Sequence, residues 1–440
     1  MATSTIPTTS LLDTVKVTAA VMAPTAAKGA IARRPRAVAL AQRLDADARA
    51  VQVLQSMRDK YGSGPLMLPI PGRRMTFVLE PDDVHRVLDQ SPVPFRLDTE
   101  EKRGALEHFQ PEGLLVSTPA ERAVRRPFNE AVLDTGSPLH RLAGPMSAAV
   151  QEEGRSLLRG GGAVPWDDFA RAWWRAVRRV VLGDGAVDDE ETTDLLLRLR
   201  KDANWTWLKP SRDATRRRFL ARLHGHLERA EPGSLAELVA ATPGLSDEEK
   251  VQQVPQWLFA FDATTWATFR ALALVHSQPG AADAVRAEVG GLPDLPYARA
   301  CVLESLRLWP TTPAILRETS EETHWSTGTL PAGSSVVVFA PLFHRDDTRV
   351  PEAHRFAPEL WLRERTNDDW PLVPFSGGAG MCPGRNVVLL TSSVMLATLT
   401  AEHDLAVDGA PLPAGGPLPG TVSPFGLSFQ PGRSPEAAAG

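Results

Sequence analysis

A glycine-rich segment near the C-terminal end carries one of the two cysteines in the chain. It reads Phe-Ser-Gly-Gly-Ala-Gly-Met-Cys-Pro-Gly-Arg-Asn over residues 375–386, and the sequence predicts an apolar helix from about 385 to 400. Such a loop can direct several backbone N–H groups at the Cys382 sulfur, and the positive end of the following helix dipole adds to them. Both effects favour a thiolate. The glycines let the backbone approach a flat ligand closely, whereas an isolated buried cysteine is more simply structural.

This segment resembles the heme-thiolate loop of the cytochrome P-450 family, Phe-x-x-Gly-x-x-x-Cys-x-Gly. Phe375, Gly378, Cys382 and Gly384 match that pattern position by position. The resemblance implies that Cys382 binds the iron of heme b and that the other three residues shape the loop around the cofactor. It also implies the family's fold, which is mainly α with a minor β region. In that fold a long central helix lies over a heme bound by the cysteine loop.

A second motif, Glu304-Ser-Leu-Arg307, lies in a predicted helix over 298–309. Glu304 and Arg307 share one helix face, as residues three apart do. Pairs of this kind are common on protein surfaces and contribute little there. Here the pair has apolar neighbours and precedes the cysteine loop, as the structural Glu-x-x-Arg of the family's K helix does. In the family an arginine completes a triad with this pair, and Leu360 occupies its position. Arg363 or Arg365 could replace it, or the triad is only a pair.

Two arginines resemble the family's ligands for the heme propionates. Arg125 falls where a C-helix arginine contacts one propionate, and Arg317 falls where a second arginine contacts the other. The planar guanidinium fork suits a carboxylate, although either arginine could also be a solvated or structural charge. Two positions depart from the family. Gly380 replaces a basic residue often found two positions before the thiolate, and Glu121 replaces the common Trp or His four positions before Arg125.

The segment 260–265, Ala-Phe-Asp-Ala-Thr-Thr, resembles the oxygen-binding part of the family's long helix, Ala-Gly-x-acid-Thr-Thr. The resemblance makes Thr264, Asp262 and Thr265 the candidate catalytic residues. The Thr264 hydroxyl could bond the carbonyl of residue 260 or donate toward a bound oxygen. However, Ala263 replaces the acid before the threonine. Asp262 lies one position earlier, which turns its carboxylate by about 100° around the helix. Phe261 replaces the family's glycine.

The elements that must position these residues are mostly helical. Amphipathic periodicity predicts helices over 36–61, 81–90, 119–134, 138–159, 166–182, 189–202 and 211–230. Short strands are predicted over 65–70, 75–79 and 335–339, and a hairpin near 421–430. Ser246 and Glu249 have the spacing of a capping box, so the longest helix is predicted from 246 to about 276, with a bend or break at Pro255.

Composition restricts the class of protein. The 440 residues carry a net charge of −5, so the basic surface that a nucleic-acid partner requires is not expected. Two cysteines exclude a disulfide framework and suit a reducing cytosol. The first 30 residues make a poor signal peptide, and no later stretch gives about 18 uninterrupted apolar residues, so we expect a cytoplasmic protein without a membrane span. Residues 1–37 are expected to be a disordered extension, 38–433 a single cytochrome P-450 domain and 434–440 a flexible tail.

The resemblance implies an oxidoreductase, a monooxygenase that inserts one atom of O2 into a hydrophobic small molecule such as a terpene, fatty acid or polyketide. Electrons would come from a separate ferredoxin and ferredoxin reductase. Because Ala263 replaces the acid, a peroxide-using or rearranging enzyme and a non-catalytic heme-thiolate binding protein stay as alternatives. Hydrolase and dinucleotide-binding motifs do not occur. Family resemblance also gives five candidates for an apolar substrate pocket, namely Trp257, Phe261, Pro313, Ile315 and Phe425.

Overall fold

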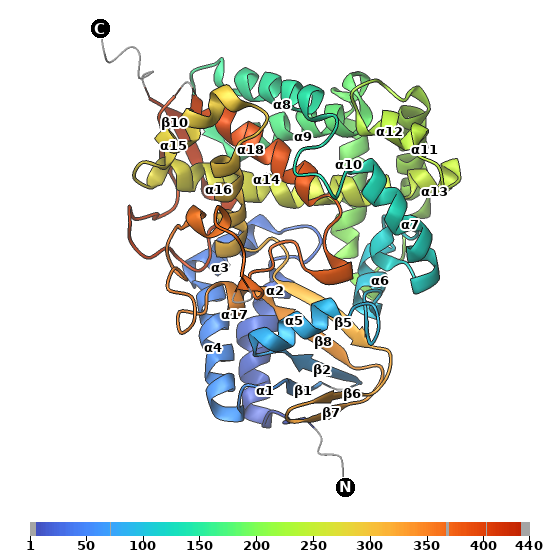
Figure 1. Ribbon diagram of the computed structural model, residues 1–440, viewed down its shortest axis with the longest axis vertical. Coiled ribbons are helices and arrows are strands. Elements are labelled where there is room, and N and C mark those ends of the chain that lie inside the picture. Colours follow the sequence, from blue (N-terminus) through green and yellow to red (C-terminus); the bar gives the residue numbers. More distant parts are fainter. Residues whose placement is uncertain (1–5, 71, 367–368, 402, 433–440) are drawn as a thin grey trace.

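The structure of the chain is a computed structural model that describes residues 6–70, 72–366, 369–401 and 403–432. Figure 1 shows an upper part made mostly of helices and a lower part that contains the largest sheet. The longer helices are α3 (Pro35–Arg43), α4 (Ala46–Tyr61), α5 (Pro81–Asp89), α7 (Pro119–Val132), α8 (Ala143–Leu158), α9 (Trp166–Leu182), α10 (Glu190–Ala203), α11 (Asp213–Arg229), α14 (Val254–Ser277), α15 (Ala281–Glu288), α16 (Pro296–Leu308) and α18 (Arg385–Ala401). The shorter α-helices are α1 (Leu11–Val17), α2 (Ala23–Ala27), α6 (Glu100–Leu106), α12 (Leu235–Ala241), α13 (Asp247–Val251) and α17 (Ala340–His344).

The strands form three small sheets. They are β1 (Leu66–Ile70), β2 (Arg73–Phe77), β3 (Phe95–Arg96), β4 (Val164–Pro165), β5 (Ala314–Thr319), β6 (Thr323–Trp325), β7 (Gly328–Leu330), β8 (Ser335–Phe339), β9 (Leu405–Asp408) and β10 (Ser428–Pro431). The largest sheet has the order β1-β2-β8-β5-β3, in which only the β2–β8 pair is parallel. All five residues of β8 are buried, which explains why this central strand reads as a continuous apolar run.

Helix α14 crosses the upper part and packs against α16 and α18 (Figure 1). The Ser246 capping box is confirmed, because Glu249 N–H donates to the Ser246 hydroxyl and Ser246 N–H donates to the Glu249 carboxylate. The predicted long helix is divided into α13 and α14 just before Pro255, which occupies the first turn of α14, where its missing N–H costs nothing. Most of α14 is buried, so this helix organises the larger hydrophobic core. The stretch 247–277 is also apolar enough to span a membrane, but 78% of its most apolar window is buried within the protein.

The expected disorder over 1–37 is wrong for residues 6–37, which form α1, α2 and the start of α3. Val17 and Val21 are buried against the apolar face of α4. The Asp13 carboxylate accepts hydrogen bonds from Lys60 Nζ and Tyr61 Oη, each at 2.6 Å. The short apolar patch of the extension therefore packs because α4 offers it both an apolar surface and polar anchors. Residues 1–5 and the expected tail 434–440 lie outside the described residues.

Two other predicted elements differ in detail. The single helix predicted over 36–61 is interrupted at Asp45, whose φ of 45° is left-handed. The hairpin predicted near 421–430 is not formed. Instead β10 pairs with β9, which precedes it in the chain outside the predicted hairpin, and with β4, which is distant in sequence. Local alternation identifies a strand but does not identify its partner.

The capping box provides a direct test of the α13 terminus. Ser246→Ala removes the acceptor for Glu249 N–H and should lower the free energy of unfolding by about 1 kcal/mol. Ser246→Asp should retain most of the stability, because its carboxylate accepts the same bond. Urea denaturation of the three proteins measures both effects, and equal midpoints for all three would contradict the assignment.

Candidate functional site

The loop that ends in Cys382 is held by its own backbone. Cys382 N–H donates to the Phe375 carbonyl at 3.0 Å, which closes the loop. Gly378 has a φ of +56°, and a Cβ at this position would lie 2.0 Å from the Leu88 carbonyl oxygen. Only glycine therefore fits here, because the loop crosses the end of α5 in backbone contact.

Cys382 itself is half-buried, three residues before α18 begins. Burial raises the pKa of its thiol, and the backbone N–H groups of Gly384 and Arg385 oppose that change without reversing it. The N–H effect expected from the sequence is thus present, but desolvation outweighs it. A thiolate at this position needs further positive charge, and a metal ion bound by Cys382 would provide it, because coordination deprotonates a thiol.

Two arginines of α7 attach the cysteine loop to that helix. Arg122 Nη2 donates to the Ala379 carbonyl at 2.5 Å, and Arg126 Nη1 donates to the Met381 carbonyl at 2.7 Å. Residues four apart lie on one helix face, so both side chains reach the same loop. Neither arginine is among the site residues predicted from the sequence, although the spacing of basic residues on α7 is a signal that indicates them.

Lys102, Arg122 and Arg317 form a cation cluster beside this loop. Arg317 is only 2% exposed and bonds the hydroxyls of Ser91 and Ser376. Burial, with the repulsion of Arg122, lowers the pKa of Arg317 to about 10. Burial also lowers the pKa of Lys102 well below its ordinary value, and Arg317 and Arg122 add to that change.

No carboxylate among the described residues lies within 4.0 Å of any charged nitrogen of the cation cluster. Asp98 is close enough to influence Lys102 and Arg122, but it is already paired with Arg96 and Arg103 at 2.8 and 3.0 Å. Buried charges are normally paired, so the cluster lacks an anionic partner. A flat cofactor that carries two carboxylates, bound beside a cysteine, would supply that partner, so these residues fit heme.

Gly380 stands where the family often has a basic residue, and the space that a side chain would fill there is used by Arg317. A Cβ at residue 380 would lie 2.3 Å from Arg317 Nη2, so the Arg317 guanidinium occupies space next to this glycine. Arg125, the other arginine singled out in the sequence, is 7% exposed and donates to the Ser117 hydroxyl at 3.0 Å. It also lies 3.6 Å from Glu121, so its charge is partly compensated within α7.

The Glu304–Arg307 pair is fully buried on α16 and bidentate, with N–O distances of 2.8 and 2.6 Å. Arg307 also donates to the main-chain carbonyls of residues 344, 352, 353 and 355. The Glu304 carboxylate accepts the N–H of Ala357 and the indole N–H of Trp361, at 2.8 and 2.9 Å. The missing arginine at 360 is therefore replaced by an indole and a backbone amide.

The two arginines considered for that position have other partners among the described residues. Arg363 pairs with Asp369 at 2.5 Å, and Arg365 donates to the carbonyls of Asp369 and Leu372. Both arginines instead support the segment that leads into the cysteine loop.

On α14 the three candidate catalytic side chains point to different partners. The hydroxyl of Thr264 donates to the Ala260 carbonyl at 2.6 Å, and that of Thr265 donates to the Phe261 carbonyl at 3.0 Å. The Asp262 carboxylate instead pairs with Arg200 of α10 at 2.6 Å. The structure thus separates the acid from the two hydroxyls, as the one-residue displacement in the sequence implies.

The five candidates for the apolar pocket are dispersed. Trp257 and Phe261 are in the large core, where the Trp257 indole donates to Asn129 at 2.7 Å. Ile315 belongs to the core under the main sheet. Phe425 packs edge-on against Trp166 and Trp266, at ring-centroid distances of 5.2 and 5.5 Å. Pro313 lines a separate cavity.

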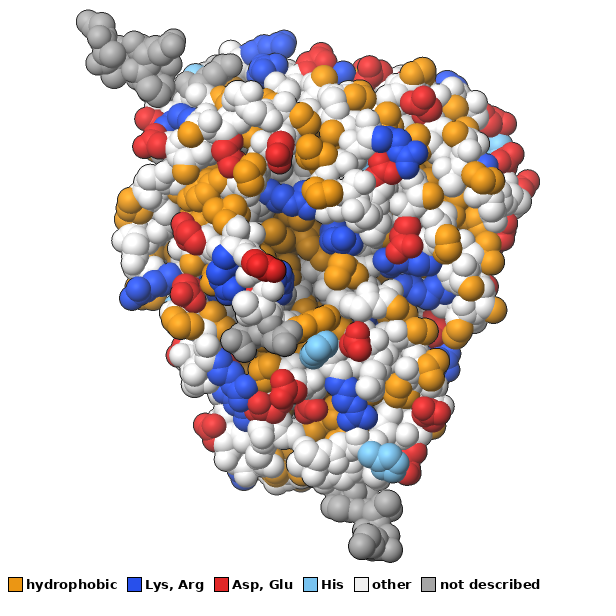
Figure 2. Space-filling view, viewed as in Figure 1, with side chains coloured by type: hydrophobic (Ala, Val, Ile, Leu, Met, Phe, Trp, Pro, Cys, Tyr) orange, Lys and Arg blue, Asp and Glu red, His pale blue; other side chains and the backbone are white. Residues whose placement is uncertain are grey.

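The face drawn in Figure 2 is hollowed near its middle, between the helical part and the sheet part. Hydrophobic side chains cover the floor of this hollow, and Lys and Arg side chains lie at its rim. Such a combination suits a mostly apolar ligand with anionic groups at one edge.

Comparisons with known proteins agree with this site. Residues 227–414 match the sequence model of the family described as "Cytochrome P450". The chain is 31% identical to cyclooctat-9-en-7-ol 5-monooxygenase of Streptomyces melanosporofaciens, over 41% of this chain and 40% of that protein. It is 32% identical to geraniol 8-hydroxylase of Swertia mussotii, over 29% and 26% respectively. These matches span less than half of the curated relatives. A solved structure, the heme domain of cytochrome P450DA, has a TM-score of 0.70 and 18% identity, and the alignment covers 88% of this chain and 92% of that one.

The Glu304–Arg307 network should be indispensable for folding. Glu304→Gln leaves the buried Arg307 charge without its counter-ion and should lower the free energy of unfolding by roughly 3–5 kcal/mol. Glu321→Gln, at an exposed position, is the matched control and should change it by less than about 0.5 kcal/mol. Urea unfolding measures both, and a small effect at Glu304 would show that the pair is dispensable.

His344 should make the fold sensitive to acid. Its Nε2 accepts the N–H of Val373 at 2.9 Å, and burial lowers its pKa from 6.5 to about 3. The unfolded chain therefore takes up a proton below about pH 6.5 while the folded chain does not, so stability present above pH 6.5 is lost as pH falls. Wild type should lose several kcal/mol relative to His344→Gln between pH 7 and pH 4. A stability difference that stays constant over this range would contradict the assignment.

Proposed function

Because residues 227–414 match the family model of cytochrome P450, we propose that the chain is a cytochrome P450 and a monooxygenase that inserts one atom of O2 into a hydrophobic small molecule. One observation carries the proposal. A half-buried cysteine ends a glycine-rich loop beside the cation cluster, which has no carboxylate partner within 4.0 Å among the described residues. A thiolate and cations for two propionates are what heme b requires of its binding site.

In this proposal Cys382 would bind the heme iron, and Phe375, Gly378 and Gly384 set the path of the loop. Heme bound through a thiolate would supply the oxygen chemistry, because a thiolate ligand pushes electron density that favours O–O cleavage. Arg317 would hold one cofactor carboxylate, with Lys102 and Arg122 beside it. Arg125 is the candidate for the other carboxylate.

Among the residues of α14, Thr264 is our candidate for holding a proton near the reaction. Its hydroxyl hydrogen is engaged with the Ala260 carbonyl, so it must leave that bond to donate elsewhere. Asp262 is a weaker candidate for proton delivery, because its carboxylate is held by Arg200. Thr265 supports the helix through its bond to the Phe261 carbonyl.

The class of substrate that we propose is based on the names of two relatives and on the apolar floor of the hollow in Figure 2. Two relatives are named for cyclooctat-9-en-7-ol and geraniol. We therefore favour a terpene over a fatty acid or a polyketide as the substrate, and a role in secondary metabolism. Electrons would come from a ferredoxin and its reductase in the cytoplasm. Among the described residues, the stretch 247–277 is apolar enough to span a membrane, but 78% of its most apolar window is buried within the protein.

A second candidate function has its own support. Since Ala263 replaces the acid and Asp262 is paired with Arg200, the usual proton relay is incomplete. A peroxide-using or rearranging enzyme would not need that relay. A non-catalytic heme-thiolate protein stays as the remaining alternative.

The carbon monoxide spectrum of the dithionite-reduced protein tests the ligand directly. Wild type should show the red-shifted Soret band of thiolate-bound heme, and Cys382→Ser should lose that shift. The matched control is Cys301→Ser, at the buried cysteine of α16, which should retain the shift. Heme binding without the shift in wild type would overturn the proposed ligation.

Turnover then separates the two candidate functions. With NADH, a ferredoxin and its reductase, a monooxygenase should form product from a terpene substrate in proportion to O2 consumed. A peroxide-using enzyme should form product with hydrogen peroxide alone. Product from neither route, in protein with the shifted band, would leave a binding role or a rearrangement.

A further inference from the structure

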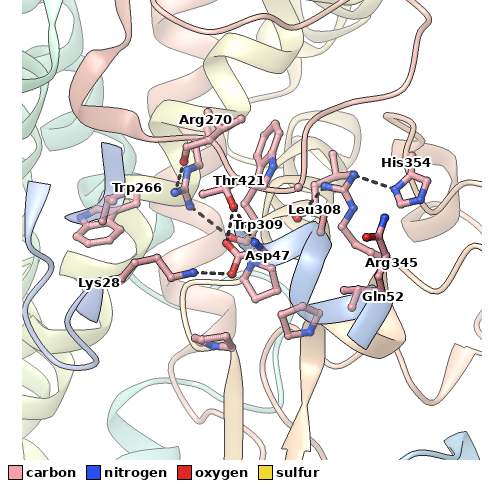
Figure 3. Close-up of a pocket in the computed structure, with 18 of the residues that line it drawn as sticks. Lys28, Asp47, Gln52, Trp266, Arg270, Leu308, Trp309, Arg345, His354 and Thr421 are labelled. Atoms are coloured by element: carbon pink, nitrogen blue, oxygen red, sulfur yellow. Dashed lines mark hydrogen bonds and ion pairs between the residues drawn. The ribbon is translucent and has the colours of Figure 1, made fainter. Parts of the chain in front are cut away.

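A second site lies where the N-terminal part of the chain meets α14 and the end of α16. It is a cavity of about 70 Å³, shown in Figure 3, and none of its lining residues belongs to the cysteine loop. We refer to it as the basic cavity. Its charged lining residues are Lys28, Arg33, Asp47, Arg270, Arg345 and Asp347.

Arg270 is the most unusual of these residues. It extends from α14, is 6% exposed, and its Nε has no hydrogen-bond partner. Its other nitrogens donate to the carbonyls of Trp309 and Val422. Burial, with repulsion from Arg33, lowers the pKa of Arg270 to about 9. Carbonyl oxygens satisfy two of its donors but do not neutralise the charge.

Two further arginines have the same character. Arg345 is 4% exposed and donates to the carbonyls of Leu418 and Pro419, at 2.7 and 2.8 Å. Arg33 is half-buried, donates to main-chain carbonyls, and lies 5.1 Å from the ring centroid of Trp266. Within the part of the chain that the structure describes, no carboxylate approaches Arg33, Arg270 or Arg345 to within 4.0 Å.

The two acids of the cavity do not balance its four cations. The Asp47 carboxylate is already bound by Lys28 at 2.5 Å and by the Thr421 hydroxyl at 2.9 Å, as Figure 3 shows. The side chain of Asp347 is 58% exposed, and the acid lies 3.6 Å from His354. Burial lowers the pKa of His354, which favours the neutral imidazole. The cavity therefore retains uncompensated positive charge in a place with little water.

We propose that the basic cavity binds one small oxyanion group, a phosphate or a carboxylate. Its volume of about 70 Å³ is several times the ~10–15 Å³ that one water needs on the same measure, so it has room for a small group of this kind. The guanidinium fork matches the oxygens of both groups. The unpartnered Nε of Arg270 is a donor that such an anion would satisfy.

This site gives the N-terminal segment a function. Lys28 and Arg33 lie on either side of a tight turn that requires Gly29, whose φ is +87° and whose Cβ would lie 2.1 Å from the Ala32 carbonyl oxygen. The Asn204 side chain fixes this turn through the N–H groups of Ile31 and Ala32, at 2.9 and 3.2 Å. A bound anion therefore connects the N-terminal segment to α14.

Direct binding to the heme-loaded, full-length protein tests the proposal. Isothermal titration uses three probes, inorganic phosphate, acetate and decanoate, against sodium chloride at equal ionic strength. At least one probe should bind saturably, and Arg270→Gln and Arg33→Gln should each weaken that binding tenfold or more. Because Arg33 is half-buried, its variant should fold even if the Arg270 variant does not. The matched control is Arg286→Gln on α15, whose partners Asp283 and Asp404 are outside the cavity, and it should bind as wild type does.

The probes also distinguish the source of the anion. Tighter binding of phosphate would indicate a free or esterified phosphate, and tighter binding of both carboxylates would indicate an organic acid. The absence of saturable binding for all three probes, or binding that Arg33→Gln leaves unchanged, would overturn the proposal. The carbon monoxide spectrum should be the same in wild type and Arg33→Gln, so failure here is independent of the proposed monooxygenase activity.

Discussion

The buried ion pair between Glu304 and Arg307 is the interaction on which the site depends. Neither side chain is accessible to water, so each must find all of its partners within the protein. Arg307 finds them in four main-chain carbonyls over residues 344–355, and Glu304 finds them in Ala357 and Trp361. One ion pair on α16 thereby fixes the segment 344–361, which is largely irregular and has no β-sheet hydrogen bonds of its own.

That constraint extends to the cysteine. The His344 carbonyl accepts from Arg307, and its ring accepts the N–H of Val373, which immediately precedes the cysteine loop. Helix α7 fixes the other side of the loop through Arg122 and Arg126. The loop is thus held from two helices that are distant in sequence. Cys382 can remain half-buried at a defined place, although burial alone disfavours its ionised form.

Among the described residues, clusters of positive charge without a carboxylate within 4.0 Å surround both Arg317 and Arg270. The cation cluster around Arg317 lies beside the cysteine loop and fits the carboxylates of heme. The basic cavity around Arg270 lies at the N-terminal segment and fits a single oxyanion. In both places main-chain carbonyls and hydroxyls satisfy individual N–H donors while the net charge persists. Hydrogen bonding and charge compensation are different requirements, and only an anion meets the second.

The sequence by itself determined the cysteine loop, the Glu304–Arg307 motif and most of the helices. Those features depend on local spacing, because a loop needs its glycines, a helix needs its period and a cap needs Ser246 with Glu249. Likewise, the one-residue displacement of Asp262 was sufficient to predict that its carboxylate faces away from Thr264.

Only the tertiary structure decided which side chains meet across long sequence separations. It placed Trp361 where an arginine was expected, paired Asp262 with Arg200, and packed the N-terminal segment that composition suggested would be disordered. It also showed that no carboxylate of the described residues lies within 4.0 Å of the charged nitrogens of Lys102 or Arg270, because the distance between charges depends on the three-dimensional surroundings. The local sequence specifies whether a segment forms a helix, a strand or a turn. Burial and charge balance depend instead on every other segment that packs around it.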